Sequence, residues 1–295
     1  MSPWVLAATV AAVAPPASPR IEIPGGVVEI VLAGRPALVS DQLLIAWVES
    51  AARAIAAYYG TFPVRRVVLT IHGGGSGRIT SGRTDGAGGE ATIEISVGDA
   101  ATPADLASNW GLVHEMVHLA FPSMRRQAWI EEGLATYVEP LVRARAGLAP
   151  PDDIWKWLVW GLPRGQQALT PGGLDGARSW AATYWGGALF CFDADVAIRQ
   201  KTGGKKSLDD ALRAIVRAGG NVTVSWSLEK ALDTGDAAVG APVLRELYAR
   251  MASKAPAEDL DAVFRSLGVR GSKDGVSYDD AAPLSSIRRG ITTGR

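Results

Sequence analysis

The stretch NWGLVHEMVHLAFPSMRRQAWIEEGLATYVE, residues 109–139, holds two of the chain's three histidines. His114 and His118 lie four residues apart, with Glu115 directly after the first. On an α-helix, side chains at positions i and i+4 share one face, so both imidazoles can reach the same point. The residues around them are mostly apolar, which indicates a buried helix whose histidines need a partner.

The pattern H-E-x-x-H is typical of helices that bind zinc in hydrolases, where the glutamate acts as general base. The sequence therefore predicts that His114 and His118 ligate one Zn²⁺ per chain and that Glu115 takes a proton from water. Because the pattern also arises by chance in ordinary helices, a third ligand is required. The third histidine of the extended pattern H-E-x-x-H-x-x-G-x-x-H is absent. The remaining possibility for the third ligand is a carboxylate from a second helix.

The segment WIEEGLATYVE, residues 129–139, offers that carboxylate. It resembles the W-x-x-E-G-x-A-x-Y segment of gluzincin metallopeptidases, in which the glutamate before the glycine binds zinc. The resemblance implies that Glu132 is the third ligand and that Glu131 is not. Thirteen residues separate His118 from Glu132, enough to turn a corner and place a second helix beside the first.

A further resemblance lies in TYWGGALFCFDADVAIRQKTGGKKSLDDALR, residues 183–213. This segment is similar to a helix and the following turn in glycyl aminopeptidase-like and other peptidase MA-like proteins. In aminopeptidases of that wider clan, the tyrosine of a Y-x-K-G pattern donates a hydrogen bond to the oxyanion of the tetrahedral intermediate. The resemblance implies this catalytic role for Tyr184, although Gly186 replaces the lysine. The alternative is a core aromatic residue beside Trp180 and Trp185.

The order of patterns predicts an α+β, zincin-like fold. A small N-terminal mixed sheet with helices precedes a mainly helical C-terminal part, and the metal site lies between them. Strands are expected at 26–34, 64–73 and 90–97, and a helix at 39–60. The glycine-rich stretch 74–89 is expected to be a loop, because it matches no phosphate-binding fingerprint. Residues 88–95 are the candidate for an edge strand along which substrate lies.

The helical part is predicted from apolar periodicity and from caps. Its helices are expected at 102–121, at 131–147 with a break at Pro140, and at 152–163, 177–204, 207–220, 242–252 and 257–268. The chain is accordingly divided into a leader or signal peptide (1–20), an α/β part (21–100), a helical metallopeptidase part (101–270) and a disordered tail (271–295). No PDZ domain of the glycyl aminopeptidases is recognisable after residue 215, where helices are expected.

Composition restricts the partners. Thirty basic residues balance thirty acidic ones, so the charge gives no reason to expect nucleic acid or an anionic membrane as partner. The apolar run 4–14 is too short to span a bilayer, so stable membrane insertion is not expected. It resembles the apolar core of a signal peptide, which predicts export to the periplasm or the exterior. The alternative is a plain disordered N-terminus on a cytoplasmic protein.

These observations favour a zinc-dependent metallopeptidase that hydrolyses a peptide or protein substrate. Two alternatives remain open at this point. One is a catalytically inactive zinc-binding relative that acts as a binding or scaffold module; the other is a metal-free polar pair between two helices. Thr136 and Glu139 follow Glu132 on the same helical face. Each is a candidate to orient one of the histidines, or to belong to a polar stripe facing solvent.

Overall fold

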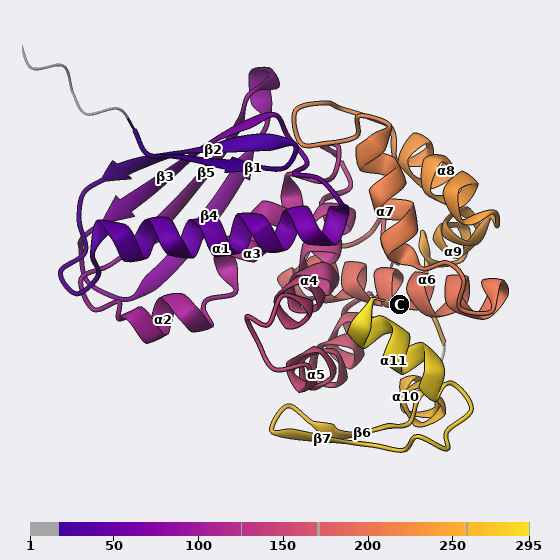
Figure 1. Ribbon diagram of the computed structural model, residues 1–295. Helices are drawn as coiled ribbons and strands as arrows, with labels where there is room; N and C mark the ends of the chain where they lie inside the picture. The colour runs from indigo at the N-terminus through magenta and orange to yellow at the C-terminus, as the bar shows by residue number, and fades with distance from the viewer. Residues whose placement is uncertain (1–17, 125, 170–171, 258, 295) are drawn as a thin grey trace, which may run out of the picture.

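The computed structural model describes residues 18–124, 126–169, 172–257 and 259–294. A sheet-bearing N-terminal part and a mainly helical remainder lie side by side (Figure 1). This arrangement confirms the predicted α+β fold. The expected leader lies outside the described residues, except for its last positions, where Arg20 begins the first strand. Within the described ranges, no helix is both long enough and apolar enough to cross a bilayer.

The described part of the N-terminal sheet has five strands in the order β1–β2–β3–β5–β4. They are β1 (Arg20–Ile23), β2 (Gly26–Ala33), β3 (Arg66–Gly73), β4 (Ile79–Asp85) and β5 (Ala91–Val97). β2, β3 and β5 are parallel, whereas β1 and β4 pair antiparallel at the two edges. Alternate apolar residues of β3 and β5 are buried, which gives the sheet one face packed on a core.

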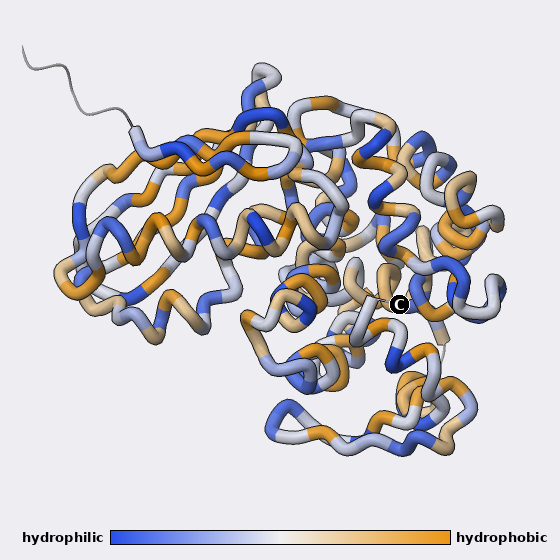
Figure 2. The backbone as a smooth tube through the Cα atoms, viewed as in Figure 1, coloured by the Kyte–Doolittle hydropathy of each residue, from blue (hydrophilic) through white to orange (hydrophobic). Residues whose placement is uncertain are grey.

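Helix α1 (Asp41–Tyr59) crosses the buried face of this sheet (Figure 1). The helix expected at 39–60 is confirmed, and Ser40 caps it by accepting a hydrogen bond from the Leu43 N–H at 3.3 Å. Figure 2 shows hydrophobic residues recurring along α1 and along the strands that it covers. Burial of these residues joins the helix and the sheet in one core.

The edge of the sheet differs from the expectation. The stretch 74–89 was expected to be a loop, but it contains β4, which pairs with β5 and forms the edge. β5 is therefore an internal strand, and the prediction that residues 88–95 form the edge is wrong. An edge strand with polar residues and glycine needs no alternation of apolar residues, so the hydrophobic pattern does not reveal it.

Helices form most of the remaining chain. They are α2 (Pro103–Ser108), α3 (Gly111–His118), α4 (Ala128–Arg145), α5 (Asp152–Ala168), α6 (Gly187–Thr202), α7 (Leu208–Arg217), α8 (Leu228–Val239), α9 (Val243–Met251) and α10 (Leu260–Leu267). A π-helical turn, η2 (Ala181–Gly186), leads directly into α6. Ser207 caps α7, and Asp210 is the reciprocal partner, because its Oδ2 accepts the Ser207 N–H at 3.0 Å. Helix α8 has no counterpart among the expected helices.

Two of the expected helices differ from the prediction. The helix expected at 102–121 is divided into α2 and α3, because Asn109 is extended and its Oδ1 accepts the Leu112 N–H at 3.1 Å. Pro140 does not break the second helix, since α4 continues to Arg145. Proline removes one hydrogen bond and strains the preceding turn. Twelve buried residues of α4 provide the packing that offsets this loss.

The C-terminal segment is the largest correction. Residues 271–295 were expected to be disordered, but the described part contains the end of β6 (Val269–Ser272), β7 (Gly275–Tyr278) and helix α11 (Ser285–Thr293). Ile287 and Ile291 of α11 are buried in the main core. The Trp155 indole N–H also donates to Thr292 Oγ1 at 3.0 Å. The hydrophobic pattern of nine residues is too short to predict such a helix by itself.

Candidate metal centre

The two histidines lie on one buried helix. α3 packs between α1 and α4, and its apolar residues Leu112, Met116 and Val117 are buried. His114 is 5% exposed, and the ring centroids of His114 and His118 are 5.0 Å apart. The helix therefore presents both imidazoles to the same neighbour, as their spacing predicted.

Helix α4 brings Glu132 to these imidazoles. Its Oε2 lies 3.2 Å from His114 Nε2 and 3.6 Å from His118 Nε2. One ligand atom from each of the three residues lies within 4.8 Å of the others, which is compact enough to hold a metal ion. The neighbouring Glu131 instead turns back to the corner before α4, where its Oε1 accepts the Met124 N–H at 3.0 Å. The two adjacent glutamates thus have different surroundings.

The charges of the three residues depend on one another. Burial acts to raise the pKa of Glu132, but the hydrogen bonds and positive charge of His114 and His118 outweigh it and lower that pKa well below its usual range. Burial lowers the pKa of His114. Burial also opposes the charged form of His118, yet the bond and charge of Glu132 raise the pKa of that histidine. Glu132 is therefore the anion of the cluster, and burial disfavours the charged form of His114.

Glu115 lies on the side of the cluster that faces the sheet. It is 9% exposed, and Thr84 of β4 directs its hydroxyl toward both the Glu115 Oε2 and its backbone oxygen, each at 2.8 Å. A Cβ at Gly82 would lie 2.6 Å from Glu115 Cγ, so only glycine lets the strand approach this closely. Sequence reasoning missed both residues, because they lie in the glycine-rich stretch expected to be a loop. The available signal was the group of β-branched residues Ile79, Thr80 and Thr84 around Gly82.

Tyr184 reaches the cluster from the π-helical turn η2. Its ring is nearly parallel to that of His114, with centroids 6.0 Å apart and an angle of 9°. Burial, followed by the negative charge of Glu132 and a hydrogen bond to it, raises the pKa of the Tyr184 hydroxyl. Trp185, the next residue, is buried in the core. π-helical turns change which face of a helix successive residues occupy and are frequent at functional sites.

Thr136 and Glu139 are buried beneath the cluster and do not face solvent. Both line a cavity of about 60 Å³ together with His114 and Tyr184. Glu139 lies 3.1 Å from Arg143, and burial raises the pKa of Glu139 to about 7 despite this cation. Among the described residues, Thr136 Oγ1 has no hydrogen-bond partner. Among the residues that the structure describes, neither side chain has a direct hydrogen bond to a histidine.

Comparisons with known proteins identify the fold. No family model matches the chain, and no curated protein matches it. Among solved structures, it is similar to an aminopeptidase N family protein from Idiomarina loihiensis, with a TM-score of 0.60, 13% identity, and coverage of 85% of this chain and 49% of that one. An M1 zinc metallopeptidase from Deinococcus radiodurans gives a TM-score of 0.50, 15% identity, and coverage of 82% and 52%.

A variant of the Deinococcus enzyme bound to a Tyr-Ser-Ala substrate is similar at the same TM-score of 0.50, with 16% identity. The chain therefore has the fold of zinc metallopeptidases of the M1 family, and it spans about half the length of these structural relatives. At such identities the likeness concerns the fold. The chemistry of the site has to be argued from the residues of this chain.

Proposed function

We propose that the protein is a zinc-dependent metallopeptidase that hydrolyses peptide bonds. The observation that carries the proposal is the convergence of His114, His118 and Glu132 from two packed helices, with Glu115 held beside them by β4. The M1-type zinc metallopeptidase fold of the chain supports it.

The donor set fits zinc. Two imidazole nitrogens and one carboxylate oxygen are the ligands that catalytic zinc sites combine with one open position. A site for calcium or magnesium would consist of oxygen donors instead. We assign one Zn²⁺ per chain to His114, His118 and Glu132. A zinc ion held there would polarise the substrate carbonyl and lower the pKa of water.

Glu115 is assigned the role of general base. It would take a proton from the attacking water and deliver it to the leaving amine. The Thr84 hydroxyl donates to Oε2 of Glu115 at 2.8 Å, which holds the carboxylate beside the metal ligands. A scaffold protein would not need a second carboxylate placed at the edge of the metal ligands. The position of Glu115 therefore favours the peptidase over the inactive binding module.

Tyr184 is assigned to stabilise the oxyanion that forms on the substrate carbonyl. Burial and the charge of Glu132 raise the pKa of its hydroxyl, which keeps the phenol protonated and able to donate at neutral pH. A well-placed donor of this kind contributes about 3–4 kcal/mol to transition-state stabilisation.

The experiment combines metal analysis with digestion of a peptide library. We expect one zinc per purified chain and cleavage of library peptides. Glu115→Gln should keep the zinc and reduce kcat by about 10²–10⁴-fold, because it removes the base and no ligand. Glu131→Gln is the matched control, since it changes a neighbouring carboxylate and still accepts the Met124 N–H. Full activity of Glu115→Gln would disprove the assigned mechanism, and absence of zinc after incubation with Zn²⁺ would disprove the metal site.

A further inference from the structure

A larger cavity adjoins the candidate metal centre. It has a volume of about 540 Å³ and lies where the start of α3 meets α4, α5 and the turn between β6 and β7. We call it the tryptophan pocket. Its principal residues are Trp110, Glu139, Arg143, Lys156, Trp157 and Trp160. Pockets of this size are typical of sites that take small ligands or parts of larger ones.

The tryptophan pocket adjoins the small cavity beside the candidate metal centre. Trp110, Glu139 and Trp157 also line the small cavity that contains His114 and Tyr184. The ring centroids of Trp110 and His114 are 5.4 Å apart. The pocket is therefore separated from the cavity beside His114 by shared wall residues, of which Trp110 contacts the His114 ring.

The walls of the pocket are preformed. Trp157 and Trp160 are stacked, with centroids 5.3 Å apart and an angle of 20°, and both pack against the buried Trp185. A Cβ at Gly161 would lie 2.0 Å from the Trp185 ring, so this helix position admits only glycine. Indole surfaces held in this way bind planar or bulky apolar groups without first losing conformational entropy.

The charges of the pocket restrict its occupant. Three cationic side chains, Arg143, Lys156 and Lys273, contribute to the lining. Its two carboxylates already have cations beside them: Asp153 lies 3.1 Å from Lys156, and Glu139 lies 3.1 Å from Arg143. A lysine or arginine side chain entering this pocket would lose water and find each lining carboxylate already paired with a cation, while Lys273 is paired with Asp274. An aromatic or large aliphatic side chain would meet indole surface.

We infer that the tryptophan pocket binds the side chain of a substrate residue beside the scissile bond and selects aromatic or large apolar residues over lysine and arginine. This inference rests on the proposed peptidase function, because it assigns the specificity of the same site. It makes Trp160 and Lys156 specificity-determining residues that do not take part in the chemistry.

The first test uses peptides that are identical except for phenylalanine, alanine or lysine at each position flanking the cleaved bond. At one position, wild-type kcat/KM should follow the order phenylalanine, alanine, lysine. Trp160→Ala should lower kcat/KM for the phenylalanine peptide by about tenfold and change the alanine peptide by less than about twofold. Trp47→Ala is the matched control, because Trp47 is a half-buried tryptophan in a separate groove beside α1. Equal kcat/KM for the three peptides at both positions would overturn the inference.

The second test reverses a charge on the surface and does not depend on repacking. Lys156→Glu should raise the ratio of kcat/KM for the lysine peptide to that for the phenylalanine peptide by about tenfold. Lys201→Glu is its control, since Lys201 is in a surface ion pair with Glu246 at 2.8 Å, outside the pocket. An unchanged ratio in Lys156→Glu would contradict the electrostatic part of the selection.

The failure of this inference can be distinguished from the failure of the proposed function. If the zinc-loaded wild type cleaves no peptide at all, the peptidase proposal fails. The pocket is then tested by binding of N-acetyl-phenylalaninamide, followed by tryptophan fluorescence. Saturable binding that weakens about tenfold in Trp160→Ala and is unchanged in Trp47→Ala would support the pocket. Equal binding in all three proteins, or none, would overturn it.

Discussion

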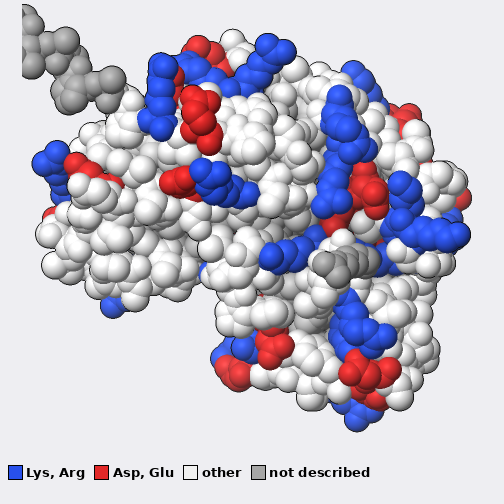
Figure 3. Space-filling view, in the orientation of Figure 1, with Lys and Arg blue, Asp and Glu red and all other residues white. Residues whose placement is uncertain are grey.

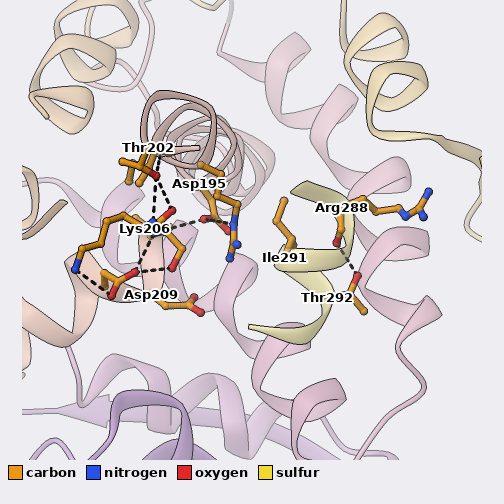
Figure 4. A network of polar contacts seen from close by, with 12 residues as sticks. Asp195, Thr202, Lys206, Asp209, Arg288, Ile291 and Thr292 are labelled. Carbon is orange, nitrogen blue, oxygen red and sulfur yellow. Dashed lines mark hydrogen bonds and ion pairs between the residues drawn. The ribbon is translucent and has the colours of Figure 1, made fainter. Parts of the chain in front are cut away.

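Two groups of buried polar residues lie within the helical part, and they are built differently. The first, which we call the aspartate network, is shown in part in Figure 4. Asp195 accepts hydrogen bonds from Arg199 at 3.0 Å, from the Leu208 N–H at 2.9 Å and from Tyr137 at 2.9 Å. Asp209 accepts from Tyr58 at 2.6 Å and from Arg145 at 2.7 Å.

The candidate metal centre is the second group. There the Glu132 carboxylate is shared between two imidazoles that are 3.2 and 3.6 Å away, and its neighbours Glu115 and Glu131 add further carboxylates. In the aspartate network each buried carboxylate has an arginine. In the metal centre, ligand atoms outnumber the positive charges that could balance them. The first arrangement holds helices together, whereas the second is suited to bind a cation.

Helix α4 connects the two groups, because it carries Glu132 at one end and both Tyr137 and Arg145 further on. The aspartate network ties this helix to α1, α6, α7 and, through Arg145 Nη2 and the Ile291 carbonyl at 2.6 Å, to α11. The ligand-bearing helix is therefore fixed by a network that has no part in the chemistry. Changing a carboxylate to its amide in each group separates the two roles.

The largest effect is expected at the metal centre. Glu132→Gln keeps the hydrogen-bonding shape but removes the charge that a cation requires, so zinc affinity should fall by more than about 100-fold, and hydrolysis should be lost with it. In the zinc-free protein the variant also loses the charged contacts of Glu132 with the two imidazoles, so the free energy of unfolding should fall by about 1–3 kcal/mol. Zinc titration against a competing chelator measures the affinity, with Glu131→Gln as control. Equal losses in both variants would show that Glu132 is not the specific ligand.

The same change in the aspartate network should have the opposite result. Asp209→Asn leaves the buried Arg145 guanidinium without its anion, which should lower the free energy of unfolding by about 3–5 kcal/mol. Zinc content and kcat per folded molecule should remain those of the wild type. Urea denaturation of both zinc-free proteins gives the comparison. Asp274→Asn, at an exposed carboxylate, provides the control. A loss below about 1 kcal/mol would mean that the network contributes little to stability.

The two groups differ in how far they can be predicted from the sequence. A helix fixes the spacing of i and i+4 residues, so the meeting of His114 and His118 was predictable, and the family resemblance pointed to Glu132 in place of Glu131. The structure brings these three residues together. Their binding of zinc stays a prediction for the metal measurements. Asp195 and Asp209 gave a weaker signal. Arg199 lies four residues after Asp195 on the same helix, but Tyr137, Tyr58 and Arg145 lie on other helices that only the tertiary fold brings close.

β4 and the C-terminal segment escaped prediction for related reasons. β4 is a polar edge strand whose pairing depends on β5, and α11 is a short helix held by contacts with α4 and α5. In both cases long-range contacts stabilise an element that has a weak local pattern. Figure 3 shows basic and acidic side chains interspersed over the visible face, as the balanced composition suggests. The charge on this face therefore does not indicate a partner.

Glu139 is a buried carboxylate that belongs to neither group, and its effect on stability can be tested by changing the pH. Burial raises its pKa from 4.5 to about 7 even though Arg143 is close. The folded state therefore binds more protons than the unfolded state between these values, and stability falls as pH rises through this range. Glu139→Gln, which stays neutral, should remove that fall and be more stable than wild type at pH 8 by on the order of 1–2 kcal/mol.

At pH 4 the Glu139→Gln variant and the wild type should be equally stable, because both side chains are then neutral. The matched control is Glu49→Gln, which changes an exposed glutamate that pairs with an arginine four residues on, at 2.6 Å. It should leave the pH dependence of the free energy of unfolding unchanged. A parallel pH profile for wild type and Glu139→Gln would show that Glu139 is charged in the folded protein at neutral pH.

The smallest expected effect concerns Glu115, which combines features of both groups: it lies beside the metal ligands, and its Oε2 receives the Thr84 hydroxyl. Thr84→Val keeps the shape of the strand residue and removes this hydrogen bond, so kcat should fall about fivefold, equivalent to about 1 kcal/mol. Thr84→Ser should restore kcat, and Thr92→Val on β5 should not change it. Zinc content should be the same in all four proteins. If Thr84→Val instead lost zinc, β4 would act by positioning the metal ligands; if kcat stayed unchanged, the backbone of α3 alone would orient Glu115.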